Sequence, residues 1–182
     1  MNTQPDNRYF ALAHEKGWWA NVPVTDGGSR LVVSSELFLA KLALIASEIR
    51  EIDIALQGHG LNEPPPGDSG KPEGWLSEIA DVYIRANDLL GACGFESVPP
   101  HEPLAYPYPM ETVLVLYSLI ADAVEAERTS RNEALKELRR LITQSAMFAY
   151  GLGASREHFM AMIDRKHAYN ATRPHRHGDK RA

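Results

Sequence analysis

One apolar repeat constrains the fold of this chain more than any other feature of its sequence. It consists of six residues separated by alternating steps of four and three: Phe38, Leu42, Ile45, Ile49, Ile52 and Leu56. This spacing places all six side chains on one side of an α-helix, whereas a β-strand would divide them between two faces. Ser34 or Ser35 can cap the helix, and Gly58 and Gly60 can end it. The segment therefore predicts a long helix with one face in a helical core.

Four further segments show the same helical period: 76–90, 110–128, 132–150 and 155–170. The stretches 61–74 and 95–109 are rich in proline or glycine and predict loops. No segment shows sustained alternation of apolar and polar residues, so we expect an all-α helical bundle of about five helices, in one domain. That domain, residues 1–182, would contain a helix pair at 36–91, an additional pair at 110–150 and a basic tail at 166–182.

Composition excludes several classes of protein. The chain has one cysteine, Cys93, which rules out an intramolecular disulfide and a structural zinc site built from several thiolates. No apolar run approaches the ~18 residues of a membrane span, and the first ten residues lack the basic-then-apolar order of a signal peptide. We therefore expect a cytoplasmic protein with no membrane partner.

The net charge of −5 is unevenly distributed along the chain. Between residues 166 and 182, five Lys or Arg residues stand against one Asp, so the remainder is more acidic than the whole. This division suggests two partners of opposite charge, such as a metal cation and a phosphate, although a basic tail can also simply be solvated. Nucleic acid is an unlikely partner, because an acidic body repels a phosphate backbone.

Two acidic doublets indicate where the cation would bind. Glu48 and Glu51 form one i, i+3 pair, and Glu78 and Asp81 form another. Each pair lies at the edge of its helix's apolar stripe, so the doublets meet if the two helices form an antiparallel hairpin. Four carboxylates in one groove repel one another, and a divalent cation removes the repulsion. All-oxygen ligation favours Mg²⁺, Mn²⁺ or Ca²⁺ over zinc.

The alternative interpretation is that these acids are solvated and pair with neighbouring cations such as Arg50 and Arg85. The spacing by itself does not distinguish a metal site from such surface ion pairs.

The doublets also belong to a longer resemblance. KLALIASEIREID (41–53) and EIADVYIRANDLLGACGF (78–95) resemble the MazG-like family of all-α nucleoside triphosphate pyrophosphohydrolases, which is marked by an ExxE doublet, a variable loop and an ExxD doublet. KGWW (16–19) and the tail KHAYNATRPHRHGDKRA (166–182) resemble the two ends of small phage-type members. Residues 96–150 depart from these compact relatives.

The resemblance implies Mg²⁺-dependent cleavage of an NTP or dNTP between its α and β phosphates, which yields the monophosphate and pyrophosphate. Mn²⁺ could replace Mg²⁺. Glu48, Glu51, Glu78 and Asp81 would hold the metal, and Glu48 or Glu51 would deprotonate the attacking water. A protein that keeps the scaffold but only binds nucleotide is the alternative.

Several residues are candidates for contact with the nucleotide. Lys166, Asn170 and Arg173 follow at i, i+4 and i+7, and they could hold phosphate or sugar oxygens, or form an ordinary solvated helix end. Lys41 could neutralise the acids, touch phosphate or form a salt bridge at the edge of the core. Trp18, like Trp19, could stack on a base, although paired aromatic residues before a helix more often pack in a core.

The helix pair at 110–150 admits two origins. It could be a degenerate copy of residues 36–91, in which Glu137 takes the place of Glu78 and Arg140 that of Asp81. A second quartet with an Arg in it would not bind a metal. The copy would supply packing that compact relatives obtain from a neighbouring subunit, and we still expect a homodimer. The alternative is an insertion that packs outside the bundle.

Overall fold

A computed structural model describes residues 6–25, 31–67, 70–101 and 112–175. These ranges contain six helices and no strand: α1 (Arg8–Glu15), α2 (Ser35–His59), α3 (Trp75–Ala92), α4 (Thr112–Glu127), α5 (Arg131–Gly151) and α6 (Arg156–Thr172). The predicted all-α class is confirmed. The predicted helix start at residue 110 and the end of the basic tail, 176–182, lie outside the described residues. None of the described helices is long and apolar enough to cross a membrane.

The apolar repeat forms the buried face of α2, as predicted. Five of its six side chains are at most 1% exposed, and Leu56, near the end of the helix, is half-buried. The Ser34 hydroxyl caps the helix by accepting a hydrogen bond from the Leu37 N–H at 3.2 Å. Gly60 follows the last helical residue with a φ of 59°, a conformation that favours glycine.

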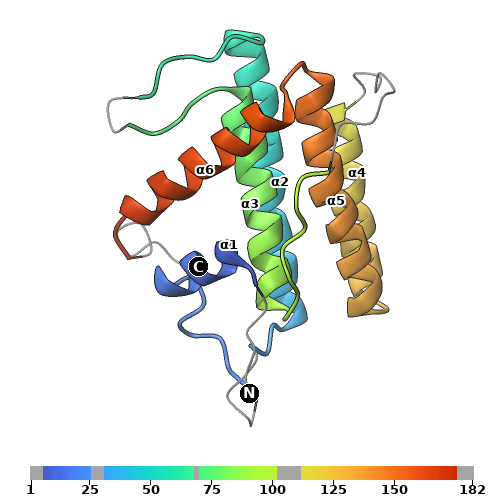
Figure 1. Cartoon of the computed structure of the whole chain (residues 1–182). Coiled ribbons are helices and arrows are strands. Elements are labelled where there is room, and N and C mark those ends of the chain that lie inside the picture. Colours follow the sequence, from blue (N-terminus) through green and yellow to red (C-terminus); the bar gives the residue numbers. More distant parts are fainter. Residues whose placement is uncertain (1–5, 26–30, 68–69, 102–111, 176–182) are drawn as a thin grey trace.

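α3 is the central helix of the fold. It packs against α1, α2, α5 and α6, and most of its residues are buried, on every side of the helix. Figure 1 shows α2 lying beside α3 and running in the opposite direction, so the two form the antiparallel hairpin that the acidic doublets require. One continuous cluster of buried apolar side chains draws on all six helices.

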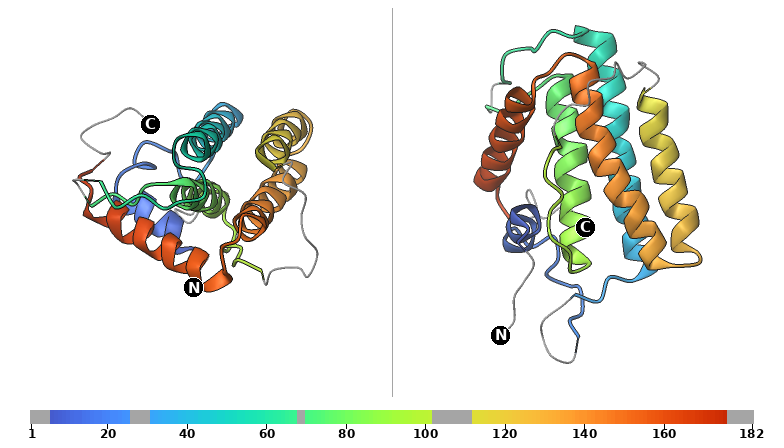
Figure 2. Two further views of the ribbon diagram at one scale, coloured as in Figure 1. Left: turned by 90° about the horizontal axis from the view of Figure 1, so that it is seen from above. Right: turned by 45° about the vertical axis from the view of Figure 1, so that its right-hand side comes forward.

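The additional helix pair belongs to this core. α4 packs on α2, α5 packs on α3, and the two pack on each other. Figure 2 shows the four helices together from above, with α1 and α6 on the other side of α3. The pair is therefore not an appendage outside the bundle, while its origin as a copy stays a prediction. Arg140 forms an ion pair with Glu137 at 2.7 Å, on the outer side of α5.

α1 is the helix that the sequence pattern did not predict. Asn7 caps it by accepting a hydrogen bond from the Phe10 N–H at 3.1 Å, and the Asn7 amide donates to the Asn87 carbonyl at 2.8 Å. The helix predicted for residues 76–90 extends to Ala92, so Gly91 lies inside α3. A Cβ at Gly91 would lie 2.5 Å from Phe10 Cβ and 2.7 Å from Asn7 Nδ2, so this glycine permits the close approach of α1.

α6 crosses α3 and also contacts α1. Ser155 caps α6 by accepting a hydrogen bond from the His158 N–H at 3.1 Å, at the start of the helix predicted for residues 155–170. Arg8 of α1 and Asp164 of α6 form an ion pair at 2.7 Å, and the rings of Tyr9 and His167 meet edge to face. α1 and α6 therefore support each other on one side of α3.

Gly91→Ala should destabilise the fold. The added methyl group collides with Asn7 and Phe10, and we expect the free energy of unfolding to fall by about 1–3 kcal/mol. Urea denaturation followed by circular dichroism measures the change. Gly58→Ala in α2 is the control, because its methyl group meets no atom within 4 Å and should raise stability by up to about 1 kcal/mol. Equal effects of the two substitutions would contradict the proposed role of Gly91.

Candidate metal and nucleotide site

The α2–α3 hairpin brings together three of the four predicted carboxylates. Glu48 of α2 and both Glu78 and Asp81 of α3 each offer one oxygen atom, and these three oxygens lie within 4.8 Å of one another. No second group of this kind occurs among the residues that the structure describes. Glu48 and Glu78 are at most 8% exposed, so this acidic triad is sheltered from water rather than spread over a surface.

Glu51 does not belong to the acidic triad, and its side chain is exposed. A step of three residues turns back about 60° around an α-helix, which moves Glu51 away from the direction in which Glu48 points. The same step separates Glu78 from Asp81, but other helices enclose α3, so Glu78 is buried and Asp81 is half-buried beside the pocket. Glu51 still acts electrostatically on Glu48, since its charge contributes to the raised pKa of that group.

Two basic side chains neutralise part of the acidic triad. Arg85, one turn after Asp81 on α3, lies 2.7 Å from Glu48 Oε1. Lys166 of α6 lies 2.6 Å from Asp81 Oδ2, and its side chain is almost fully buried. The alternative interpretation of the acids, as surface ion pairs, included an ion pair with Arg85. That ion pair is present, but Glu48 is buried and belongs to the acidic triad.

Lys71 adds a third cation from the loop before α3. Partial burial works against its charged form, but the carboxylates of Glu78, Glu73 and Asp81 outweigh this and raise its pKa. The charge of Lys71 in turn opposes the upward shift in the pKa of Glu78.

Glu78 is the buried carboxylate of the triad that lacks a hydrogen-bond donor, among the described residues, for one of its oxygens. The residue is 4% exposed, and no described group donates a hydrogen bond to its Oε2 atom. Burial raises the pKa of Glu78 to about 7, although Lys166 opposes the shift. A buried carboxylate oxygen without a donor is unfavourable, and a divalent cation would satisfy it. The oxygen-only donor set suits Mg²⁺ or Mn²⁺.

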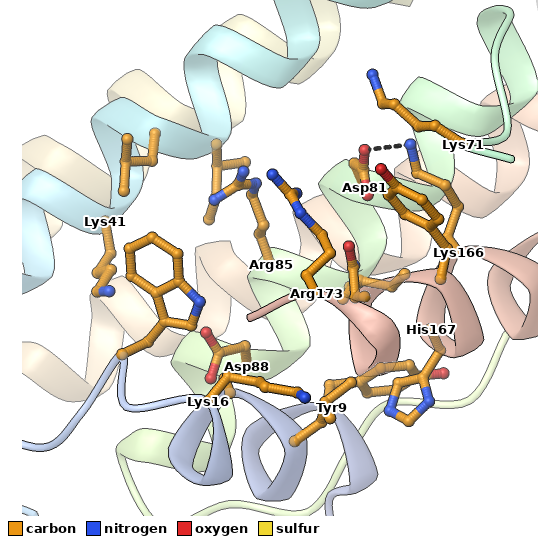
Figure 3. A pocket seen from close by; sticks show the side chains of 18 residues that line it. Tyr9, Lys16, Lys41, Lys71, Asp81, Arg85, Asp88, Lys166, His167 and Arg173 are labelled. Atoms are coloured by element: carbon orange, nitrogen blue, oxygen red, sulfur yellow. Dashed lines mark ion pairs between the residues drawn. The ribbon is translucent and has the colours of Figure 1, made fainter. Parts of the chain in front are cut away.

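A pocket extends from Asp81 between α1, α2, α3 and α6. Six of its lining residues are Lys or Arg and two are Asp, so the pocket is cationic although the chain as a whole is acidic. In Figure 3, Asp81, Lys71 and Lys166 lie at one end, while Lys41, Lys16 and Asp88 lie at the other. Arg85 and Arg173 occupy the space between these two ends.

All five predicted substrate-binding residues line this pocket: Trp18, Lys41, Lys166, Asn170 and Arg173. Lys41 lies at the end away from Asp81, with its ammonium 4.4 Å from the centre of the Trp19 ring and 5.6 Å from that of Trp18. Of the two roles proposed for the tryptophans, core packing applies to Trp19, and stacking on a base remains open to Trp18. Trp19 is buried in the core, whereas Trp18 is half-buried and faces the pocket.

Four lining residues were not predicted to contact the nucleotide: Lys16, Lys71, Arg85 and Asp88. Of these, Arg85 was named only as a possible ion-pair partner of the acids. Lys71 lies in a segment interpreted only as a loop, where nothing in the sequence indicates its direction. Arg85 and Asp88 follow Asp81 at i+4 and i+7, which places all three on one side of α3. That spacing is the signal by which both could have been found.

Comparison of the chain with protein-family models, with curated proteins and with solved structures found no match. The resemblance to the MazG-like family therefore stays a prediction.

Removal of the Glu78 charge should change how stability depends on pH. The pKa of Glu78 is about 7 in the folded protein against 4.5 ordinarily, so the folded state holds this proton more tightly. Glu78 therefore lowers stability as the pH rises from about 4.5 to 7, by a total on the order of 3 kcal/mol. Urea denaturation of metal-free Glu78→Gln should show a flatter profile than wild type. Parallel profiles would contradict this assignment, and Glu137→Gln on α5 is the control.

Proposed function

We propose that this protein is a Mg²⁺-dependent nucleoside triphosphate pyrophosphohydrolase that releases a nucleoside monophosphate and pyrophosphate. The observation that carries the proposal is the acidic triad, with its unsatisfied Glu78 oxygen, at one end of a cationic pocket. A metal ion and a polyphosphate need opposite charges close together, and the pocket offers both. The resemblance of the two doublets to the ExxE and ExxD motifs of the MazG-like family points to the same reaction.

The basic side chains of the pocket would bind and orient the triphosphate. Arg85 and Arg173 extend into its middle, where each guanidinium can donate two hydrogen bonds to phosphate oxygens (Figure 3). Lys71 and Lys166 stand beside Asp81, where they add positive charge next to the cleaved bond. Asn170 can donate to a sugar or phosphate oxygen.

Glu48, Glu78 and Asp81 would hold the metal, which supplies Lewis-acid polarisation of the phosphate when it is bound. Glu51 is then the acid left to accept a proton from the attacking water. It is exposed, it lies outside the acidic triad, and its charge acts on both Glu48 and Lys71. The leaving pyrophosphate can take its proton from solvent.

A panel of the common NTPs and dNTPs with Mg²⁺, read out as pyrophosphate release, tests the proposal. Pyrophosphate from at least one nucleotide, abolished by a chelator, is the expected result. Release of inorganic phosphate alone, or no product from any nucleotide, would refute it.

Glu51→Gln should reduce kcat by about 10²–10⁴-fold, the range typical for loss of a general base. The fold should be unchanged, because the side chain is exposed and packs in no core. Steady-state pyrophosphate release and circular dichroism measure the two quantities. Glu125→Gln is the matched control, because Glu125 is an exposed glutamate of α4 outside the pocket. Wild-type turnover by Glu51→Gln would remove Glu51 from the mechanism.

Arg173→Gln should weaken nucleotide binding, with KM rising by about tenfold, because a charge-assisted hydrogen bond to phosphate is lost. Arg140→Gln serves as the control, since Arg140 pairs with Glu137 on α5, away from the pocket. Both variants are assayed at several nucleotide concentrations. Equal KM values for the two variants would show that Arg173 does not contact the substrate.

A binding protein without turnover is the second candidate, and one observation favours it. Glu48 and Asp81 already have ion-pair partners in Arg85 and Lys166, so two of the three acids are neutralised without a metal. In that case calorimetry would detect nucleotide binding that needs no Mg²⁺, and no pyrophosphate would appear. Mg²⁺-dependent binding accompanied by pyrophosphate release would exclude it.

We propose a cytoplasmic homodimer. α4 exposes Leu114 and Val124 and α2 exposes Ile54, apolar side chains of the kind that a second subunit could cover.

A further inference from the structure

A second carboxylate in the pocket has no place in the reaction proposed above. Asp88 lies on α3 two turns after Asp81 and lines the pocket at the opposite end (Figure 3). It does not belong to the acidic triad. Lys16 and Lys41 stand at the same end of the pocket, and the charges of Lys41 and Arg85 act on Asp88.

Asp88 is held in a fixed orientation. Its Oδ1 atom accepts a hydrogen bond from the indole N–H of Trp19 at 2.8 Å, and Trp19 is only 1% exposed. Burial raises the pKa of Asp88 to about 7, while the Trp19 N–H and the charges of Lys41 and Arg85 oppose the shift. An ionised carboxylate offers about four lone-pair positions on two oxygens, so this contact leaves acceptor capacity on both.

The spacing between Asp81 and Asp88 suits a nucleotide. Seven residues of α-helix correspond to about 10.5 Å along the axis, a length comparable to that from the α-phosphorus of a nucleotide to the far edge of its base. A nucleotide whose phosphates lie beside Asp81 and Lys166 therefore extends its base toward Asp88. Trp18 lines the pocket at this point too, and an indole ring provides a surface against which a base can pack.

We propose that Asp88 selects guanine. The two oxygens of a carboxylate accept hydrogen bonds from two adjacent N–H donors, and guanine presents such a pair in its N1–H and 2-amino groups. Adenine and cytosine present an amino group next to a ring acceptor, and uracil and thymine present one N–H between two carbonyls, so each would direct a lone pair at Asp88. The inference rests on the proposed function only in taking a nucleoside triphosphate as the ligand, and it names Asp88 as the residue that determines specificity.

Nucleotide binding and turnover at pH 8.5, where Asp88 is ionised, test this inference on the wild-type protein. GTP should bind about ten- to a hundredfold more tightly than ATP, CTP or UTP, and kcat/KM should follow the same order. ITP, which lacks only the 2-amino group, should lose most of this advantage. Calorimetry in the presence of Ca²⁺, in place of Mg²⁺ to slow turnover, gives the affinities independently of catalysis.

Asp88→Asn provides the sharper test. An amide replaces one acceptor by a donor, so the variant should lose its preference for GTP and bind XTP, which has a carbonyl in place of the 2-amino group, about tenfold more tightly than GTP. Asp122→Asn on the exposed side of α4 is the control and should keep the wild-type order. A purely structural role for Asp88 would weaken all nucleotides equally and could not invert the order.

The outcomes separate this inference from the proposed function. Equal turnover of all bases by the wild type would overturn the role of Asp88 and leave the pyrophosphohydrolase intact. Selective GTP binding without pyrophosphate release would overturn the reaction and support Asp88. If Asp88→Asn does not fold, the comparison of GTP with ITP and XTP on the wild type decides: equal affinities for the three refute the inference.

Discussion

The mutual repulsion of three sheltered carboxylates is the constraint around which this fold is arranged. Glu48, Glu78 and Asp81 lie within 4.8 Å of one another in a region from which water is largely excluded. Such a cluster is tolerated only if opposite charge is brought to it. Arg85 and Lys166 supply that charge. Because Lys166 belongs to α6, its ion pair with Asp81 helps to hold α6 against α3.

The same arrangement makes the pocket different in charge from the rest of the chain. The cations that balance the triad continue along the cavity through Arg85 and Arg173 to Lys41 and Lys16. A highly charged anion can therefore approach the carboxylates without meeting a net negative surface. Charge of both signs within one cavity is what a metal and a polyphosphate would need together, and neither the total charge nor the pI of the chain reveals it.

Rigidity of the pocket comes from contacts that are distant in the sequence. α1 lies against α3 because Gly91 has no side chain, and Asn7 joins the start of α1 to the Asn87 carbonyl. Trp19 continues this support by fixing Asp88. The pocket is thus lined partly by side chains whose positions are set by the core behind them, which favours selective binding over adaptable binding.

Much of the helical fold could be predicted from the sequence, because helices depend on local patterns. The apolar repeat of α2, the cap at Ser34, the helix that begins near residue 155 and the described parts of the proline- and glycine-rich loops all agree with the prediction. α1 was not predicted, because its eight residues are too few to show a helical repeat of apolar side chains. Its stability depends on packing against α3. The site was predictable to the extent that i, i+3 spacing puts two acids near one helical edge.

Packing between the helices determines which of those helical edges is buried. Glu51 and Asp81 occupy equivalent places in their doublets, but α2 keeps one side exposed whereas α3 is enclosed, so only Asp81 joins the acidic triad. The positions of Lys71 and Arg85 beside the acids, and of Asp88 at the far end of the pocket, likewise follow from how helices and loops meet. Local patterns in the sequence specify five of the six described helices and the acids on them, because such patterns depend on neighbours a few residues away. The composition of the pocket depends on the mutual rotation of helices joined by long loops, which local spacing does not encode.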